Sequence, residues 1–299
     1  ELWSLLTAAL ASEASLLAPR DVGRAIDLVT QSATNQAEHG LPPNLVTEAN
    51  LCNWYWLAGH WEELDEFLTT SALLATETSL MAKVAAGADH LLVWAGLRER
   101  RLIEKYPGEQ APALPGMAAI EQSRLLCASL SRRDHAAAVE LAKGMIAAEL
   151  EMSGVNEDLH VYWPLALCAV LEADDMDALR ELLDGLAPYQ DKALPLAVRG
   201  HRRVGQALLD MRAETPDDDA IVASLEAGIA ELAGAGSLVW QAHADEDLAA
   251  WHLSRGRAEG AEPHFVAARA TYVALGARDW LARLDALEAG LPARKRSGG

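Results

Sequence analysis

Four segments of the chain align with one another without a gap, and each has the pattern of a helical hairpin. Each begins with the last apolar residues of one amphipathic helix, crosses a short polar turn and enters a second amphipathic pattern. Their first leucines are 73 (57 to 130), 41 (130 to 171) and 82 (171 to 253) residues apart, which corresponds to two, one and two units of about 37–41 residues. Hairpins of this size cannot bury their apolar faces alone, so the pattern predicts a stack of antiparallel hairpins, an α-solenoid. The aligned segments are Leu57–Leu68, Leu130–Leu141, Leu171–Leu182 and Leu253–His264.

The composition favours an all-α fold. Hydrophobic residues make up 51% of the chain, and many of them are Ala and Leu, which are strong helix formers. Strictly alternating β-branched runs are missing, and no stretch of 18 or more apolar residues suggests a membrane span. Helices are expected over residues 2–17, 21–39, 44–58, 61–75, 78–104 (as one helix or two), 117–131, 134–151, 158–172, 175–187, 192–213, 217–234, 238–254, 258–275 and 278–290.

The pattern of breaks predicts one continuous body. Residues 1–291 are expected to form a single array, with a possible hinge at the proline-rich stretch 107–116. Residues 292–299 are basic and contain Gly and Ser, so they are expected to be a disordered linker. The chain opens on Glu1 inside an apolar helical pattern, which favours a segment of a longer protein.

The formal charge of −19 argues against nucleic-acid binding by this segment, because phosphate contacts need clustered Lys and Arg. Several acidic clusters, such as Glu62–Glu66, Glu172–Asp177 and Asp217–Asp219, fall where helices are expected to begin, and carboxylates there cap free N–H groups. The three cysteines lie in apolar helical stretches without metal-ligand spacing. They are expected to be reduced core thiols of a cytoplasmic protein.

Catalytic and metal chemistry is the weakest interpretation of the sequence. Neither a zinc-binding HExxH motif nor the GxSxG motif of a nucleophilic serine occurs. His243 and Asp247 are four residues apart on one expected helix face, with Glu246 between them, but a solvated polar face explains them better than a metal site. We therefore expect no enzymatic activity, no cofactor and no metal.

Small residues flank a large one in the second helix of several hairpins. Examples are Ala137, Leu141 and Gly144, then Ala178, Leu182 and Gly185, and, one residue later in the frame, Ala261, Phe265 and Ala268. This spacing resembles the tetratricopeptide repeat, so the expected fold is a tetratricopeptide-like α-solenoid.

The closing segment carries a more specific resemblance. Residues 264–287 are similar to the last repeat of large ATP-binding LuxR-type regulators (MalT-like, of the STAND class) and of some actinobacterial cyclases. In the regulators, a basic linker then leads to a DNA-binding domain, and the basic tail resembles such a linker. Neither an ATP-binding motif nor a helix-turn-helix lies in this sequence, so those activities are not assigned to it. The matching residues are Ala267, Ala268, Arg269, Ala270, Tyr272, Leu275, Gly276, Ala277, Trp280 and Leu281.

The tetratricopeptide resemblance implies a binding groove lined by the first helix of each hairpin. Nine Trp residues against two Phe suggest aromatic anchors for a ligand, although the core also accounts for most of the Trp residues. The basic pair Arg199 and Arg203 would favour a ligand with an aromatic or acyl body and an anionic end. The groove positions implied by the repeat frame are Asn53, Trp56, Gln122, Ser129, His160, Trp163, Asp245 and His252.

The expected function is therefore that of a sensor or partner-binding segment in a multidomain signalling or transcriptional regulator. Its partners would be a small-molecule inducer or a protein in the concave groove, together with other domains of the same chain. A scaffold for docking or self-association without a small ligand is the alternative, and it would show a shallow groove and apolar patches on an outer or terminal face. An enzyme would need a deep pocket with converging titratable groups.

Overall fold

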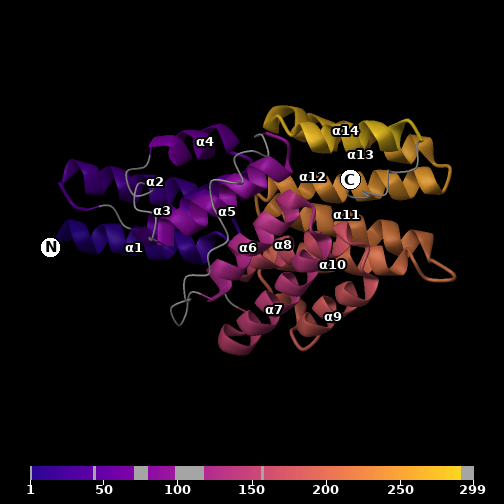
Figure 1. Cartoon of the computed structure of the whole chain (residues 1–299), viewed down its shortest axis with the longest axis horizontal. Coiled ribbons are helices and arrows are strands. Elements are labelled where there is room, and N and C mark those ends of the chain that lie inside the picture. The colour runs from indigo at the N-terminus through magenta and orange to yellow at the C-terminus, as the bar shows by residue number, and fades with distance from the viewer. Residues whose placement is uncertain (1, 43–44, 71–79, 98–117, 156–157, 291–299) are drawn as a thin grey trace.

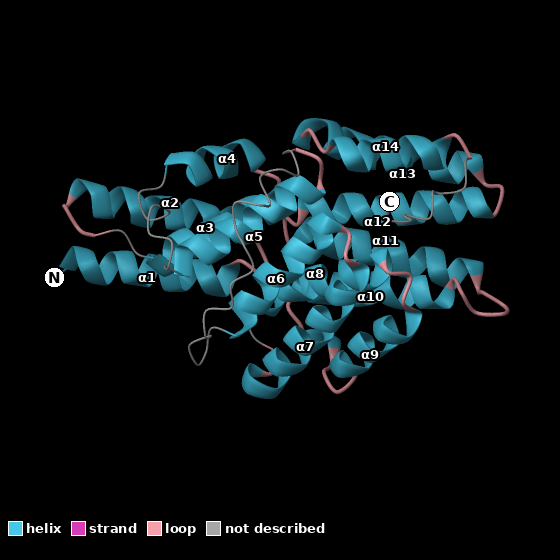
Figure 2. Cartoon of the chain, in the orientation of Figure 1, coloured by secondary structure: helices cyan, strands magenta, loops and turns pink. Residues whose placement is uncertain are grey.

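A computed structural model describes residues 2–42, 45–70, 80–97, 118–155 and 158–290. Within these ranges the chain forms fourteen α-helices and one short 3-10 helix, and no strand (Figures 1 and 2). The all-α prediction is confirmed for this part of the chain. The predicted hinge at 107–116 and the predicted linker at 292–299 lie outside the described residues.

The helices are α1 (Leu2–Leu17), α2 (Val22–Glu38), α3 (Leu45–Ala58), α4 (Trp61–Thr70), α5 (Leu80–Trp94), α6 (Ala118–Arg132), α7 (His135–Ser153), α8 (Leu159–Glu172), α9 (Met176–Leu186), the 3-10 helix (Asp191–Ala193), α10 (Leu196–Asp210), α11 (Asp218–Gly234), α12 (Leu238–Ser254), α13 (Ala258–Leu275) and α14 (Arg278–Glu288).

Most predicted boundaries agree with these to within two residues. The end predicted at residue 75 lies outside the described residues, and α10 ends at Asp210 instead of residue 213. Two other differences have local causes. The helix expected from residue 192 begins at Leu196, because Pro195 holds Leu194 in an extended conformation (φ −82°, ψ 140°). Helix α5 ends at Trp94 and is followed by Gly96 with φ of 81°. The pattern predicted over 78–104, as one helix or two, is therefore broken at Gly96, and its part from residue 98 onward lies outside the described residues.

The hairpin turns share a left-handed residue. It is Arg133, Asp174 or Gly256 in three of them, each three positions after the aligned leucine, with φ of 60°, 55° and 70°. In the first hairpin the left-handed residue is Gly59 (φ 77°), only two positions after Leu57. That turn is one residue shorter, so the gap-free alignment of the first segment with the other three is wrong by one position.

Aspartates cap several of the helices, and two of them, Asp175 and Asp217, belong to the acidic clusters predicted to do so. The side chains of Asp21, Asp134, Asp175 and Asp217 each accept a hydrogen bond from the amide three residues later. Each such cap contributes about 1 kcal/mol by satisfying an N–H that the helix leaves free.

The small–large–small stripe is buried in two of the three helices that carry it. Ala261, Phe265 and Ala268 lie in the core, and so do Ala178 and Leu182. In α7 the buried stripe is instead Ala138, Ala142 and Met145, one position after the predicted residues, as in α13. A shift of one residue rotates the face by about 100°, which leaves Gly144 on the outside.

Neighbouring helices in the chain pack on one another, and the first helices also reach the last. The pairs α1–α2, α10–α11 and α12–α13 make extensive contacts, and α5 to α8 pack in order. Helix α3 additionally contacts α12 near the middle of the molecule (Figure 1). The Val22 amide donates to Ala235 O at 3.1 Å. A single buried core therefore runs from Ala14 to Leu284.

Candidate functional site

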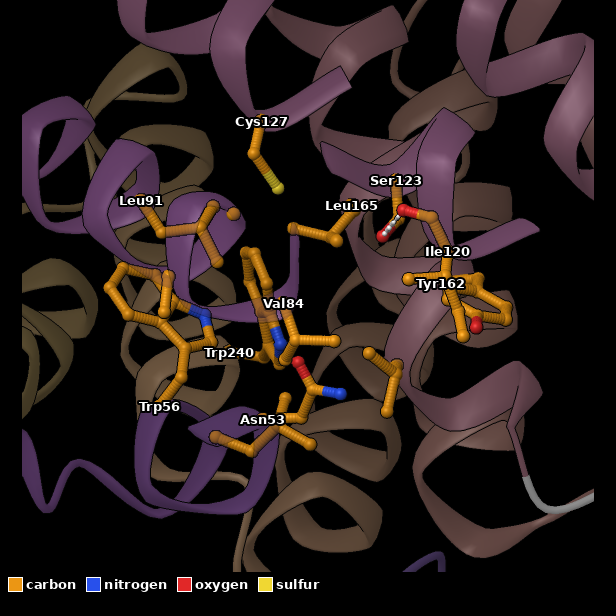
Figure 3. Close-up of a pocket in the computed structure, with 14 residues that line it drawn as sticks. Asn53, Trp56, Val84, Leu91, Ile120, Ser123, Cys127, Tyr162, Leu165 and Trp240 are labelled. Atoms are coloured by element: carbon orange, nitrogen blue, oxygen red, sulfur yellow. Dashed lines mark hydrogen bonds between the residues drawn. The ribbon is translucent and has the colours of Figure 1, made fainter. Parts of the chain in front are cut away.

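A pocket lies where five helices converge, and Figure 3 shows its walls. The space between its walls is about 510 Å³ when the part open to solvent is counted, but a water-sized sphere fits in only about 30 Å³ of it. That is room for a few water molecules, so a larger ligand requires the wall side chains to move apart. On α3, α5, α6 and α8 successive lining positions are one, three or four residues apart, so each of these helices contributes one side of its surface, and α12 contributes a single residue. The lining residues are Asn53, Trp56 and Leu57 from α3; Val84, Gly87, Ala88 and Leu91 from α5; Ile120, Ser123 and Cys127 from α6; Val161, Tyr162 and Leu165 from α8; and Trp240 from α12.

The walls are mainly apolar, with a few polar groups among them. Ser123 Oγ donates to the Ile120 carbonyl at 3.1 Å. Burial raises the pKa of the Cys127 thiol to about 12, and it also raises the pKa of Tyr162, helped by the nearby charges of Asp158 and Glu149. Both groups are therefore neutral at pH 7.

Five tryptophans beside the pocket form a cluster, which we call the tryptophan cluster: Trp56, Trp61, Trp94, Trp240 and Trp280. Trp56 stacks on Trp61 with 4.5 Å between ring centroids. Trp280 meets Trp56, Trp61 and Trp94 edge to face at 5.1–6.1 Å. Aromatic pairs in these geometries contribute about 0.5–1.5 kcal/mol each beyond area burial. Since three of the five lie before residue 95 and two after residue 239, the cluster joins the two ends of the chain.

Backbone contacts reinforce this end-to-end interface, by which we mean the contacts of residues 22–96 with residues 235–283. The Asp279 amide donates to Ala95 O at 3.3 Å, and Arg278 Nε donates to Gly96 O at 2.7 Å. A Cβ on Gly96 would lie 2.7 Å from Asp279 Oδ1. Only glycine therefore combines the positive φ at this position with so close an approach.

A buried polar network lies on the C-terminal side of the interface. Arg283 Nε and Nη2 pair with both carboxylate oxygens of Glu246, and Tyr272 donates to Glu246 at 2.8 Å. Arg283 Nη2 lies 3.0 Å from His243 Nδ1. Burial, reinforced by the charge of Arg283, lowers the pKa of His243 well below its usual value. His243 is therefore neutral at pH 7, and its Nδ1 accepts from Arg283.

The structure brings two of the predicted groove residues together and spreads the others. Asn53 and Trp56 both line the pocket. Trp163 is fully buried and His160 nearly so, and neither is among the residues that line the pocket. The expectation that Trp163 faces an open groove is therefore wrong, because neighbouring helices cover it completely. Gln122 is half-buried, with its Nε2 facing Gly144 of α7, and Ser129 is buried.

The remaining predicted groove residues are engaged in side-chain contacts away from the pocket. Arg199 and Arg203 both pair with Glu231, at 2.6 and 3.1 Å. Asp245 is buried and accepts from His264 at 2.7 Å, and His252 stacks on the same His264 ring. No cation of the Arg199–Arg203 group is among the residues that line the pocket.

Sequence reasoning missed most of the pocket. Trp240, Tyr162 and Ser123 line it, yet none of them was singled out by the repeat frame. The excess of Trp over Phe was the one signal in the sequence that bears on this site, since two of the lining residues, Trp56 and Trp240, are tryptophans.

The described residues offer neither a metal site nor a membrane-spanning helix. They contain no group of three His, Cys, Asp or Glu side chains placed to hold a metal ion, and the suggested His243–Asp247 pair forms no such group. None of the helices in this part of the chain is long and apolar enough to cross a membrane.

No protein-family model, no curated protein and no solved structure matches this chain. What the protein does is therefore inferred from the pocket and the end-to-end interface.

Proposed function

We propose that this chain is the sensor segment of a cytoplasmic, multidomain signalling or transcriptional regulator of the LuxR type, and that it binds a small-molecule inducer without catalysing a reaction. Its hairpins are then tetratricopeptide-like units of a right-handed solenoid, and its other partners are domains of the same regulator. The closing-repeat residues support this, because Ala268, Tyr272 and Trp280 are buried in the last hairpin and its cap.

The observation that carries the proposal is the position of the pocket. Trp56 and Trp240 line the pocket, and they also belong to the tryptophan cluster that joins the ends of the chain, Trp56 through Trp280 and Trp240 through Trp94. A ligand between these two walls contacts both ends at once. It binds the closed arrangement better than an open one, and such differential affinity is what a sensor requires.

The absence of a charged lining supports binding rather than catalysis. None of the described residues that line the pocket is Asp, Glu, Lys, Arg or His. The titratable groups among these residues are Cys127 and Tyr162, and burial raises the pKa of both. Neither is poised to exchange a proton near pH 7, so this pocket is better suited to recognition.

A docking scaffold is the second candidate, and α1 favours it. Leu2, Leu5, Leu6 and Leu16 are exposed on this terminal helix, with Trp3 beside them. Exposed apolar patches of this kind occur at protein–protein contacts. In that case the α1 face, and not the pocket, is the functional surface.

The two candidates are separated by blocking the pocket. Gly87 lines the pocket, and a Cβ placed there would lie 3.8 Å from Arg124 Cα of α6, an ordinary contact. Gly87→Leu therefore adds a side chain at the α5–α6 wall of the pocket, and unchanged far-UV circular dichroism is required of the variant. The probe is prodan, a neutral fluorescent naphthalene ketone, followed by its emission and by the rise in melting temperature on binding.

We expect prodan to bind the parent chain and to lose at least tenfold in affinity with Gly87→Leu. The control is Gly144→Leu, an interior helix glycine of α7 that faces outward and should leave binding unchanged. If neither substitution alters binding, or if prodan does not bind, the pocket is not a ligand site and the scaffold is the better account.

A further inference from the structure

We propose that the pocket takes an uncharged, mainly apolar molecule with a carbonyl-type hydrogen-bond acceptor, and that the indole N–H groups of Trp56 and Trp240 bind this acceptor. The proposal rests on the sensor function above, because it names the class of inducer for the same pocket.

Two buried donors in the pocket wall lack acceptors. Trp56 and Trp240 are each only 2% exposed, and the Nε1 atom of each is buried with no hydrogen-bond partner among the described residues. Both side chains reach toward the middle of the pocket (Figure 3). Leaving a buried N–H without an acceptor costs about 1–3 kcal/mol. A ligand oxygen between the two rings would recover part of that cost.

Trp61 differs from Trp56 and Trp240, because its indole N–H has an acceptor within the chain. Trp61 stacks on Trp56, and its Nε1 donates to the Trp56 carbonyl at 3.1 Å. That donor is satisfied within the chain and needs no ligand. Asn53 lies on the same wall as Trp56, and its amide offers one more donor and one more acceptor for a second polar group.

The described walls of the pocket disfavour an anion. The described lining carries no cationic side chain, and the adjacent Arg124 is already paired with Glu121 at 2.6 Å. The raised pKa values of Cys127 and Tyr162 reflect strong desolvation of this wall. Burying an ionised carboxylate here, without a partner, would cost far more than burying a neutral ketone. The sequence led us to expect an anionic ligand beside Arg199 and Arg203, whereas the lining of this pocket favours a neutral ligand.

Three naphthalenes that share one ring body test the proposal. Prodan carries a neutral ketone, its parent dimethylaminonaphthalene lacks the acceptor, and the corresponding dimethylaminonaphthoate carries a carboxylate in place of the ketone. Affinity is measured by fluorescence titration on the 299-residue chain. We expect prodan to bind about tenfold more tightly than the parent compound and at least tenfold more tightly than the naphthoate.

Indole-to-phenyl substitutions locate the hydrogen bonds. Trp56→Phe and Trp240→Phe each remove one N–H and keep an aromatic ring, and each should weaken prodan about fivefold. The affinity of the parent compound should change much less, since it accepts no hydrogen bond through a ketone. Trp163→Phe is the matched control, because its N–H is equally buried and also lacks an acceptor among the described residues, but it does not line the pocket.

Each outcome decides one question. If the naphthoate or the parent compound binds as tightly as prodan, the neutral-acceptor class is wrong while the pocket stands. If Trp56→Phe and Trp240→Phe weaken all three compounds equally, the rings contribute shape and the N–H groups do not bind the carbonyl. If none of the three binds, or if Gly87→Leu leaves their binding unchanged, the sensor function fails and this inference fails with it.

Discussion

Substituting Arg283 tests whether water is excluded from the polar network beside the end-to-end interface, because the cost of leaving Glu246 unpaired depends on its burial. Arg283→Met keeps the length of the side chain and deletes its charge. Glu246 is only 4% exposed and would retain just the Tyr272 hydroxyl as a donor from this network. Breaking a buried ion pair from one side costs about 3–5 kcal/mol, because the remaining charge is left uncompensated. We therefore expect a loss of that size in the free energy of unfolding.

The assay is urea unfolding at neutral pH, followed by far-UV circular dichroism. The matched control is Arg269→Met, which breaks exposed ion pairs with Asp285 and Glu288 on the neighbouring surface and should cost less than about 1 kcal/mol. The double variant Arg283→Met with Glu246→Leu should lose less than Arg283→Met alone, since the Glu246 carboxylate is no longer buried without its partner.

The reasoning is refuted if Arg283→Met costs no more than Arg269→Met. Glu246 would then be solvated, and the interface around Tyr272 and Trp280 would not exclude water.

Three other substitutions test separate parts of the structure. Gly228→Ala places a Cβ 2.8 Å from Val204 Cγ2, so it should lower the free energy of unfolding in urea by about 1–3 kcal/mol. In the control Gly144→Ala the Cβ meets only Gln122 Nε2 at 3.9 Å, and the free energy of unfolding should rise by about 0.5–1 kcal/mol. Equal effects of the two substitutions would contradict the close packing of α10 on α11. Burial and the neighbouring Glu246 raise the pKa of Asp247 to about 7, so the stability that its protonated form contributes is complete below about pH 4 and lost as the pH rises through 7. Asp247→Asn should therefore raise the melting temperature relative to the parent chain at pH 8 and not at pH 4, and an equal difference at both pH values would show that this carboxyl titrates normally. Trp163→Ala should cost about 3–5 kcal/mol of stability, because the side chain is fully buried, with no specific loss of prodan binding; a stable variant that no longer binds would place Trp163 in the site.

The helices were predictable because their ends are marked locally. Asp175 and Asp217 cap α9 and α11, and Gly276, with φ of 65°, ends α13. These signals act within a few residues of one another, so the sequence shows them directly. The same holds for Pro195, although its effect on the start of α10 was not anticipated.

The pocket was only partly predictable, because its walls come from distant parts of the chain. A repeat frame indicates which face of a helix turns inward, but it does not show what covers that face. Trp163 was assigned to a groove for this reason and lies in the core. Trp56 was assigned to the groove and does line the pocket, yet its burial depends on Trp61 and on Trp280, more than 200 residues later (280 − 56 = 224).

Hydrogen exchange at the end-to-end interface tests the central claim most directly. The amides of Val22 and Asp279 donate across the interface to Ala235 and Ala95, at 3.1 and 3.3 Å, so their exchange reports its opening. The Ala220 amide, which donates to Asp217 within its own helix end, is the internal control. With prodan at 100 times its dissociation constant, binding that requires the closed interface slows exchange at Val22 and Asp279 by up to about 100-fold, and leaves Ala220 unchanged. Unchanged exchange at Val22 and Asp279 in the saturated complex would show that ligand binding and interface closure are uncoupled, and the chain would not be a sensor.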